Sequence, residues 1–437
     1  MSGRAPASMR DVTRLAWPAI LSFVLNNGYR INDQFWVQGL GAHAQAAIAA
    51  CTFLLITNFG LIYLVAGGAL PLVARATGAR DPEARDCAVR HAILASLLLA
   101  VVVGFCGHAA MPQIAAWMGL EGAEAVATVD YMRAIYLGIL PLALAPLVDN
   151  VFIAMGETRV PMALQIAAVC TNLVLNPILI YGAGLGIAGA AWATVASRAL
   201  TVLIGFTLLH GRYGVSLRPR GMPSFRLART IVEKGTPLGL SILAYAAVYQ
   251  VLFALVLARL TTDVRAGLGI GFNAFESISF PFFLGVALAG SSLVGRNLGA
   301  SDPAGALLAV RNSRRLGHIT GLAFTLLFLV GGPVVAPLYS SDPAVIRETV
   351  GYVQVLAFSQ FFVAMETVNE KVLQGAGHTR PILWISTFGN LLRIPLAWVL
   401  AISLGWAGHG VWWAINVTTW LKAWLFHREV QRGRWLH

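Results

Sequence analysis

Five carboxylates stand inside stretches that are otherwise apolar. They are Asp33, Asp149, Glu276, Glu366 and Glu370. A charged side chain costs about 2.5 to 3.5 kcal/mol at the centre of a membrane helix even on the low insertion scales, so such an acid has a function or a neutralising partner. Removal from water also favours the protonated form of a carboxylic acid. These acids therefore predict proton or cation chemistry in an apolar protein.

Asp33 is the best placed of these acids, within the stretch YRINDQFW at 29–36. Arg30 precedes it by three residues, and side chains at i and i+3 of a helix can meet. Two hypotheses stay open: a buried ion pair of structural role, or a coupling acid that Arg30 tunes. Pro18 in the same stretch interrupts the backbone hydrogen bonding, which predicts either a hinge or a fixed kink.

The composition indicates that membrane helices hold these acids. Of the 437 residues 57% are hydrophobic and 11% are charged, against about 25% charged in globular proteins. No charged residue occurs from Gln34 to Ala74, a run longer than the roughly 20 residues that cross a bilayer. We therefore predict an all-α integral membrane protein with twelve transmembrane helices. Their expected ranges are 15–38, 46–74, 92–118, 131–154, 161–182, 187–209, 237–260, 267–294, 317–338, 351–374, 382–403 and 409–426.

The basic residues orient the predicted spans. With the N-terminus in the cytoplasm, most of the 31 Lys and Arg residues fall in inside segments, and the outside loops hold Arg265 and Arg347. This asymmetry follows the positive-inside rule, so we expect both termini in the cytoplasm. The net charge of +12 then reports topology, and no nucleic-acid partner is predicted.

The chain repeats itself at an offset near 220 residues. VARATGARDPEA (73–84) returns as VGRNLGASDPAGA (294–306), GETR (156–159) as GHTR (377–380), and LGIAG (185–189) as LGWAG (404–408). Each half holds six spans, an even number, so both halves enter the membrane in the same orientation. We predict an N-lobe at 1–209, a cytoplasmic linker at 210–229 and a C-lobe at 230–437. Paired lobes of this kind are typical of secondary transporters that alternate access.

The repeat also relates the remaining acids. At the repeat offset, Asp149 corresponds to Glu370, which predicts a shared structural role for the two acids at matching depth in the membrane. Asn150, next to Asp149, is a candidate to line a first-lobe site. Glu276 and Glu366 are either members of structural ion pairs or contacts to a substrate. Lys371 and Arg393 are their candidate partners.

Several segments together resemble one family. LAWPAI, LGAHAQAAIAA, LVARATGARDPEA, GETRVPM, NLVLNPILIY, LGIAGAAWATVASR and SSLVGRNLGA are similar to the multidrug and toxic compound extrusion (MATE) family, and most similar to its bacterial DinF-like branch. The resemblance covers essentially the whole chain. It implies two six-helix bundles arranged as a V that export organic, often cationic, drugs in exchange for protons or sodium.

The resemblance also implies a cation site in the first lobe. The helix-one carboxylate of the family falls on Asp33, the helix-five pair on Asn172 and Asn176, and a helix-six threonine on Thr194. Asn176 departs from the family pattern, which has Asp there, so one of two expected carboxylates is an amide. Proton storage or sodium binding at this site would then rest on a single acid.

These expectations define a function with alternatives. We expect a monomeric multidrug antiporter of the bacterial inner membrane, in contact with lipids and small organic substrates, that needs no cofactor and uses H⁺ or Na⁺ as coupling ion. A flippase for a lipid-linked substrate is the alternative on the same fold, with Arg30, Arg198, Lys371 and Arg393 as candidate contacts to pyrophosphate. The chain lacks the P-loop of a nucleotide-driven pump, the loop signature of major-facilitator transporters, and the HExxH and GxSxG motifs of a membrane enzyme.

Overall fold

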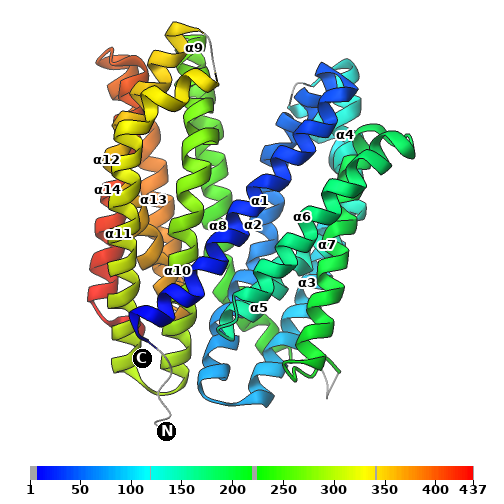
Figure 1. Cartoon of the computed structure of the whole chain (residues 1–437), viewed down its shortest axis with the longest axis vertical. Coiled ribbons are helices and arrows are strands. Elements are labelled where there is room, and N and C mark those ends of the chain that lie inside the picture. Colours follow the sequence, from blue (N-terminus) through cyan, green and yellow to red (C-terminus); the bar gives the residue numbers. More distant parts are fainter. Residues whose placement is uncertain (1–6, 119, 219–223, 340–341, 437) are drawn as a thin grey trace. The chain divides into compact units, whose positions relative to one another are not determined.

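The computed structural model describes residues 7–118, 120–218, 224–339 and 342–436. Helices dominate this part of the chain, and no strand occurs in it (Figure 1). By their internal contacts the residues form two compact units. The N-terminal unit is Leu21–Ile242, and the C-terminal unit holds the residues up to Ile20 and those from Leu243 onward. α1 (Met9–Val37) and α8 (Phe225–Leu255) contribute residues to both units.

The N-terminal unit is a helical bundle with a buried apolar core. Beside its parts of α1 and α8 it contains α2 (Ala42–Gly78), α3 (Pro82–Trp117), α4 (Gly122–Leu137), α5 (Ile139–Ala154), α6 (Arg159–Pro177), the π-helix η2 (Ile178–Gly182) and α7 (Gly186–Gly211). Met111, Met132 and Ile135 are among the core side chains that are buried almost completely.

The C-terminal unit has the same plan. It contains α9 (Thr262–Ile270), the π-helix η4 (Gly271–Glu276), α10 (Ser277–Gly299), α11 (Pro303–Val335), α12 (Pro343–Gly375), α13 (Arg380–Ala397), the π-helix η6 (Trp398–Ser403) and α14 (Ala407–Gln431). Its core is rich in aromatic rings, including Phe283, Phe328, Tyr352 and Trp412.

The internal repeat of the sequence recurs as local structure. Asp81 and Asp302 each cap a helix, α3 and α11, by accepting a backbone N–H three residues later at 2.9 Å, and a proline follows each at the first helical position. The residues before these caps, Arg80 and Ser301, both have a left-handed backbone, with φ of 56° and 55°. The two loops are therefore the same structural motif.

A second recurrent feature follows a proline near the end of α6 and of α13. Each of Pro177 and Pro395 lacks an N–H to donate. Both helices then continue as π-helical segments, η2 and η6, in which the hydrogen-bond register is one residue wider. The widened turns end the corresponding spans in the two units in the same way.

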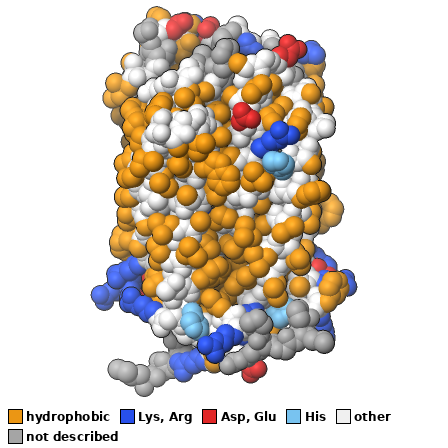
Figure 2. Space-filling view, turned by 90° about the vertical axis from the view of Figure 1, so that its right-hand side faces the viewer, with side chains coloured by type: hydrophobic (Ala, Val, Ile, Leu, Met, Phe, Trp, Pro, Cys, Tyr) orange, Lys and Arg blue, Asp and Glu red, His pale blue; other side chains and the backbone are white. Residues whose placement is uncertain are grey.

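The surface matches a lipid environment. Figure 2 shows one face on which hydrophobic side chains form a broad band, with Lys and Arg side chains gathered toward one end. On α3, Leu98 and Phe105 are 71% and 76% exposed, an arrangement that water would disfavour and lipid would not. Eight helices of the described part are long and apolar enough to cross a membrane, and counting the bent pair α4 and α5 as one span gives nine.

Each of the twelve predicted spans falls on a helical run of the structure. The three runs beyond those nine are α1, α12 and α14, which carry buried polar groups such as Asp33, Gln360 and Asn416. The predicted lobe bounds at 209 and 230 describe the sequence repeat and stay a prediction. By contacts, the units instead divide inside α1 and inside α8.

Candidate functional site

A buried polar cluster forms where α1, α6 and α7 of the N-terminal unit meet. α6 and α7 pack against each other (Figure 1). Asn172 and Asn176 are four residues apart on α6, so their side chains share one face of that helix. Asp33 lies in the last turns of α1, and Thr194 lies two turns into α7. Asp33 is 7% exposed and both asparagines are fully buried.

The side chains of this cluster, which we call the Asp33 cluster, are joined by hydrogen bonds. Asn176 Nδ2 donates to Asp33 Oδ1 at 2.8 Å, and Thr194 Oγ1 donates to Asp33 Oδ2 at 3.2 Å. Asn172 Nδ2 donates to Thr194 Oγ1 at 3.4 Å. The four residues assigned by family resemblance are therefore in contact, and both oxygens of the carboxylate accept a neutral donor. Their role in ion coupling stays a prediction.

Two further residues of α1 belong to the Asp33 cluster and were not predicted. Asn32 Nδ2 donates to Asn172 Oδ1 at 2.8 Å, and Trp36 Nε1 donates to Asn32 Oδ1 at 3.1 Å. The polar run NDQ at 32–34 was the sequence signal for Asn32. Its neighbour Asp33 stands out in the sequence because a carboxylate carries charge and an amide does not.

One acceptor of the Asp33 cluster has no hydrogen-bond partner among the described residues. Asn176 Oδ1 is buried and unbonded, while the amide nitrogen of the same side chain donates to Asp33. An unmatched buried oxygen is costly, so its retention points to a second state in which it is used. The oxygens of Asp33, Asn172, Asn176 and Thr194 are the hard donors that suit an alkali cation, and the single carboxylate matches one positive charge.

Among the described residues, Arg198 is a cation close to this region. Its guanidinium lies 4.9 Å from the centre of the Tyr29 ring, and it donates from Nη1 to Gln165 Oε1 at 2.9 Å and from Nη2 to Asn26 Oδ1 at 2.8 Å. Its charge acts on both Asp33 and Asp149. The side chain of Arg30, the predicted partner of Asp33, lies outside the described residues.

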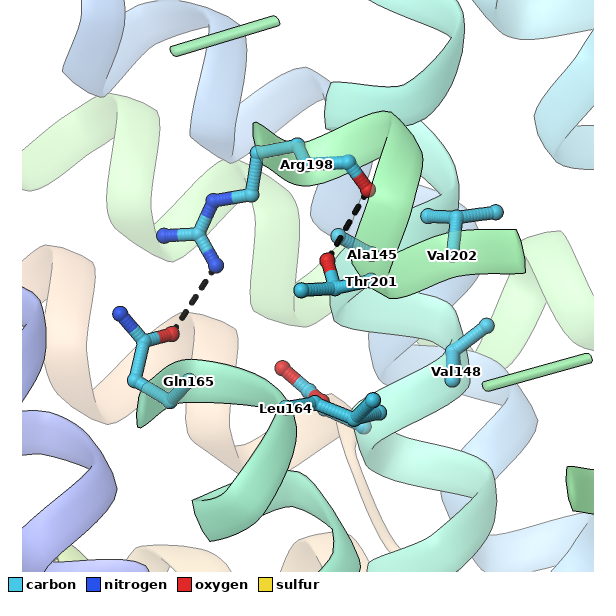
Figure 3. A pocket seen from close by; sticks show the side chains of 8 residues that line it. Ala145, Val148, Leu164, Gln165, Arg198, Thr201 and Val202 are labelled. Carbon is cyan, nitrogen blue, oxygen red and sulfur yellow. Dashed lines mark hydrogen bonds between the residues drawn. The ribbon is translucent and has the colours of Figure 1, made fainter. Parts of the chain in front are cut away.

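Asp149 and Asn150, adjacent on α5, have different surroundings. Asp149 lines a pocket with Arg198, Gln165 and Thr201, between apolar walls from α5, α6 and α7 (Figure 3). Asn150 is buried and donates to the backbone carbonyl of Ala66 on α2 at 2.9 Å. Asn150 therefore ties α5 to α2, which is a structural contact, whereas Asp149 faces a cavity.

The three predicted acids of the C-terminal unit each have a partner within that unit. Tyr352 donates its hydroxyl to Glu276, Lys422 pairs with Glu366 at 2.8 Å, and Lys371 pairs with Glu370 at 2.8 Å. Arg393 donates to Tyr249 at 2.8 Å and to Thr418 at 3.1 Å. Lys371 and Arg393 were the predicted partners of Glu276 and Glu366. Lys371 instead pairs with Glu370, and the partner of Glu366 is Lys422.

Pro18 lies inside α1, two residues before the point where contacts divide this helix between the units. In α8 the corresponding Pro237 lies five residues before the division between Ile242 and Leu243. Both prolines lie within five residues of the point where their helix passes from one unit to the other, and the hinge at Pro18 stays a prediction. The cysteines are free, and no group of three or more His, Cys, Asp or Glu side chains suited to a metal occurs among the described residues.

Twelve helical runs in two repeated units, with a buried acid among amides, define a polytopic membrane protein of the transporter type. The chain belongs to the MatE family, whose model matches residues 18–178 and 237–399. The predicted all-α membrane fold of two six-helix repeats is confirmed by this match and by similarity to solved structures. A crystal structure of MATE in the bent conformation and an outward-facing multidrug resistance MATE family transporter of the MOP superfamily both superpose with a TM-score of 0.90. They are 22% and 21% identical, and each match covers 98% of this chain and 96% of the other.

Curated relatives agree with the family assignment. The probable multidrug resistance protein NorM of Thermotoga maritima is 26% identical over 412 residues, which is 90% of this chain and 86% of NorM. The multidrug resistance protein PmpM of Pseudomonas aeruginosa is 26% identical over 414 residues, which is 92% of this chain and 85% of PmpM.

Proposed function

We propose that this protein exports small organic compounds across the cell membrane in exchange for a monovalent cation, H⁺ or Na⁺, that is taken up at Asp33. The observation that carries the proposal is the geometry of Asp33, a buried carboxylate held on both oxygens by the neutral donors Asn176 and Thr194. Membership of the MatE family and relatives named as multidrug resistance proteins support export of drugs.

Protonation of Asp33 would change its hydrogen bonding. The ionised carboxylate accepts from Asn176 Nδ2, whereas the protonated acid needs an acceptor for its new O–H. Rotation of the Asn176 amide by half a turn would present Oδ1, the atom that has no partner in this structure. The side chain can therefore satisfy both states of Asp33 without a second carboxylate.

Sodium would use the same residues differently. Asp33, Asn172, Asn176 and Thr194 would supply the oxygens that hold the ion, and the ion would neutralise the buried charge of Asp33. Either cation removes the cost of an unpaired carboxylate in an apolar surrounding. Because Asp33 and Pro18 lie on the same helix, a change of charge at Asp33 would act on a helix that is already interrupted. We propose that this coupling drives alternating access.

A flippase for a lipid-linked pyrophosphate has less support. Such a function needs several cations that converge on one anionic group. Of the candidates, Lys371 pairs with Glu370 and Arg393 donates to Tyr249 and Thr418, so both already have structural partners. Arg198 remains as a cation at a pocket in the N-terminal unit.

The test is export of a fluorescent organic cation from proteoliposomes under an imposed proton gradient and, separately, a sodium gradient. Wild type should export the dye with one of the two gradients, which identifies the coupling ion. With the same gradient, the export rate of Asp33→Asn should be at least tenfold lower. Asp130→Asn, which changes an exposed acid on α4, is the matched control and should retain it. Normal gradient-driven export by Asp33→Asn would overturn the proposal.

A further inference from the structure

Three basic side chains of the C-terminal unit gather over α12, against which α11 and α14 both pack (Figure 1). They are Arg314, His318 and His427, which we call the basic cluster. On α11, Arg314 is half-buried and donates from Nε to Asn369 Oδ1 of α12 at 2.8 Å. His318, one turn later, stacks on the Phe361 ring of α12 with the ring centres 5.2 Å apart. Both histidines are exposed, so the cluster is open to the surface of the unit.

The helical register brings His427 of α14 to the level of Arg314. The rings of Trp420, on α14, and Phe362, on α12, have their centres 5.6 Å apart. His427 follows Trp420 by seven residues, and Asn369 follows Phe362 by seven. Seven residues are about two turns, so each pair shares one face of its helix. His427 therefore lies beside Asn369, the residue that binds Arg314, and the charge of Arg314 acts on His427.

The protein supplies no anion to this cluster. Among the described residues, Arg314 makes a hydrogen bond to Asn369 and no ion pair. Its buried Nη2 has no acceptor, and neither does the buried Nδ2 of Asn369. Two unmatched donors, one of them on a guanidinium, are unfavourable, so the site favours a ligand that brings acceptor oxygens. A guanidinium is complementary to the paired oxygens of a carboxylate or a phosphate.

The nearest acids in the sequence of α12 and α14 are bound to other cations. Glu370, next to Asn369, pairs with Lys371 at 2.8 Å. Glu429, two residues after His427, pairs with Arg432 at 2.8 Å. The positive charge of the cluster is thus left without compensation from these acids.

The depth of the cluster corresponds to the inner edge of the bilayer. The predicted spans begin at 317 in α11 and end at 426 in α14, next to His318 and His427. No Asp, Glu, Lys or Arg occurs from Ile319 to Tyr339, whereas Arg314 and Arg315 directly precede this run. With the cytoplasmic N-terminus that the sequence predicts, α11 enters the membrane here and α14 leaves it. This is the level at which the phosphates of the inner leaflet lie.

An exposed apolar stripe continues outward from the cluster along α11. Ile319, Leu322 and Leu326 are 56%, 54% and 64% exposed, and their spacing of three and four residues places them on one face of the helix. Leu322 lies one turn after His318, so the basic and apolar parts adjoin. A ligand that joins an anionic group to acyl chains matches both parts, whereas a free phosphate matches only the first.

We propose that the basic cluster binds an anionic phospholipid of the inner leaflet, with Arg314 holding the phosphate and the ring N–H groups of His318 and His427 contacting its oxygens. The acyl chains lie along the apolar stripe of α11. Basic residues that merely follow the positive-inside rule are exposed and need no partner, whereas Arg314 is half-buried and fixed by Asn369. The inference concerns a lipid site in the C-terminal unit and does not depend on the proposed export function.

The test compares two lipids with the same acyl chains. Purified protein in detergent is titrated with dioleoyl phosphatidylglycerol, which is anionic, or with dioleoyl phosphatidylcholine, which is zwitterionic, and native mass spectrometry counts the bound lipids. Wild type should bind the first phosphatidylglycerol molecule about fivefold more tightly or better, as one arginine near an anionic headgroup predicts. Equal affinities for the two lipids would overturn the proposal.

The variants locate the preference. Arg314→Gln should bring the ratio of phosphatidylcholine to phosphatidylglycerol dissociation constants close to one. Arg226→Gln, which changes an exposed arginine in the first turn of α8, is the matched control and should keep the wild-type ratio. If Arg314→Gln protein does not fold, His427→Ala changes an exposed member of the cluster and should lower the ratio. A wild-type ratio in every folded variant of the cluster would place the preference elsewhere and overturn the inference.

Inorganic phosphate separates a lipid site from a site for a free anion. It offers the same acceptor oxygens without acyl chains. Wild type should keep its bound phosphatidylglycerol when millimolar inorganic phosphate is added, and displacement of the lipid would overturn the proposal in favour of a soluble phosphate ligand. Because the measurement uses neither a drug nor an ion gradient, its result is independent of whether the protein exports drugs.

Discussion

Asn176 donates its side-chain amide to the Asp33 carboxylate across 2.8 Å, from α6 to α1. The contact joins an acid to an amide at the position where the family resemblance predicts a second acid. Asp33 is thereby the single carboxylate of its hydrogen-bonded cluster among the described residues. The ionised state of the cluster carries one negative charge, which a single proton or sodium ion neutralises.

Asn176→Asp should shift the pH dependence of export. Two carboxylates at hydrogen-bond distance cannot easily ionise together, so one of them holds a proton to higher pH. If protons drive export, the midpoint of the rate against pH should move upward by about one unit or more. Proteoliposome export measured from pH 5 to 9 checks this, with Asn176→Leu as the variant that removes the hydrogen bond and should reduce export. An unchanged profile for Asn176→Asp would contradict proton coupling at this cluster.

Gly235→Ala should destabilise the crossing of α2 and α8 in the N-terminal unit. A Cβ on Gly235 would lie 1.9 Å from the backbone oxygen of Leu64, and one on Gly68 would lie 2.0 Å from the oxygen of Ile231. Backbone oxygens cannot rotate away as a flexible side chain can, so the helices must separate, at a cost of roughly 3 kcal/mol. We expect a lower apparent Tm and a lower yield of folded protein. Gly211→Ala is the control, because nothing lies within 4 Å of the added Cβ, and equal Tm values for the two variants would contradict the close crossing.

Asp86→Ala should loosen the segment after α7. Asp86 Oδ2 accepts the backbone N–H of Ser216 at 2.8 Å, and its neighbour Arg85 donates to the backbone oxygen of Gly214 at 3.1 Å. Asp86 also accepts from Arg85 at 2.7 Å, which holds this arginine in place. We expect trypsin to cleave this segment several times faster in the variant. Glu83→Ala, an exposed acid one turn earlier on α3, should leave the cleavage rate unchanged.

The sequence was sufficient for the spans, the repeat and, by family resemblance, four members of the Asp33 cluster, for identifiable reasons. Long uncharged runs allow little besides membrane helices, and the matched Asp-Pro caps at 81–82 and 302–303 fix two helix starts. The side-chain bonding was harder to predict. Residues such as Asn32 and Gln165 are ordinary in sequence and acquire meaning only when helices distant in the chain bring them to Asn172 and Arg198.

Ion pairing was the least predictable feature. The sequence offers Lys371 and Arg393 as partners for Glu276 and Glu366, and the actual choice depends on helix rotation, which periodicity does not specify. Glu366 pairs with Lys422 from α14, and Lys371 turns back to Glu370 beside it on α12. The bounds of the compact units were unpredictable for a similar reason, because α1 and α8 are continuous in sequence and divide only by their contacts.

Glu429 should make stability depend on acid pH. It lies near the end of α14, beyond the predicted span, and accepts from Arg432 at 2.8 Å and from His378 at 3.3 Å. Burial alone would raise the pKa of Glu429, but the hydrogen bonds from Arg432 and His378 outweigh burial and hold this pKa below the ordinary value of 4.5. A group whose pKa is lower in the folded state stabilises the protein above its unfolded pKa, and this contribution is lost as pH falls through the folded value. At neutral pH we expect Glu429→Gln to be less stable than wild type by roughly 1 kcal/mol.

The difference in stability between wild type and Glu429→Gln should persist from pH 7 to about pH 5 and close below pH 4.5, where the wild-type acid takes up its proton. Thermal unfolding of both proteins in nanodiscs at pH 7, 5 and 3 measures it. The control is Glu233→Gln, whose pair with Arg229 has both side chains more than half exposed and so contributes little. A gap between Glu429→Gln and wild type that stays constant down to pH 3 would mean that the shape of the side chain matters there and its charge does not.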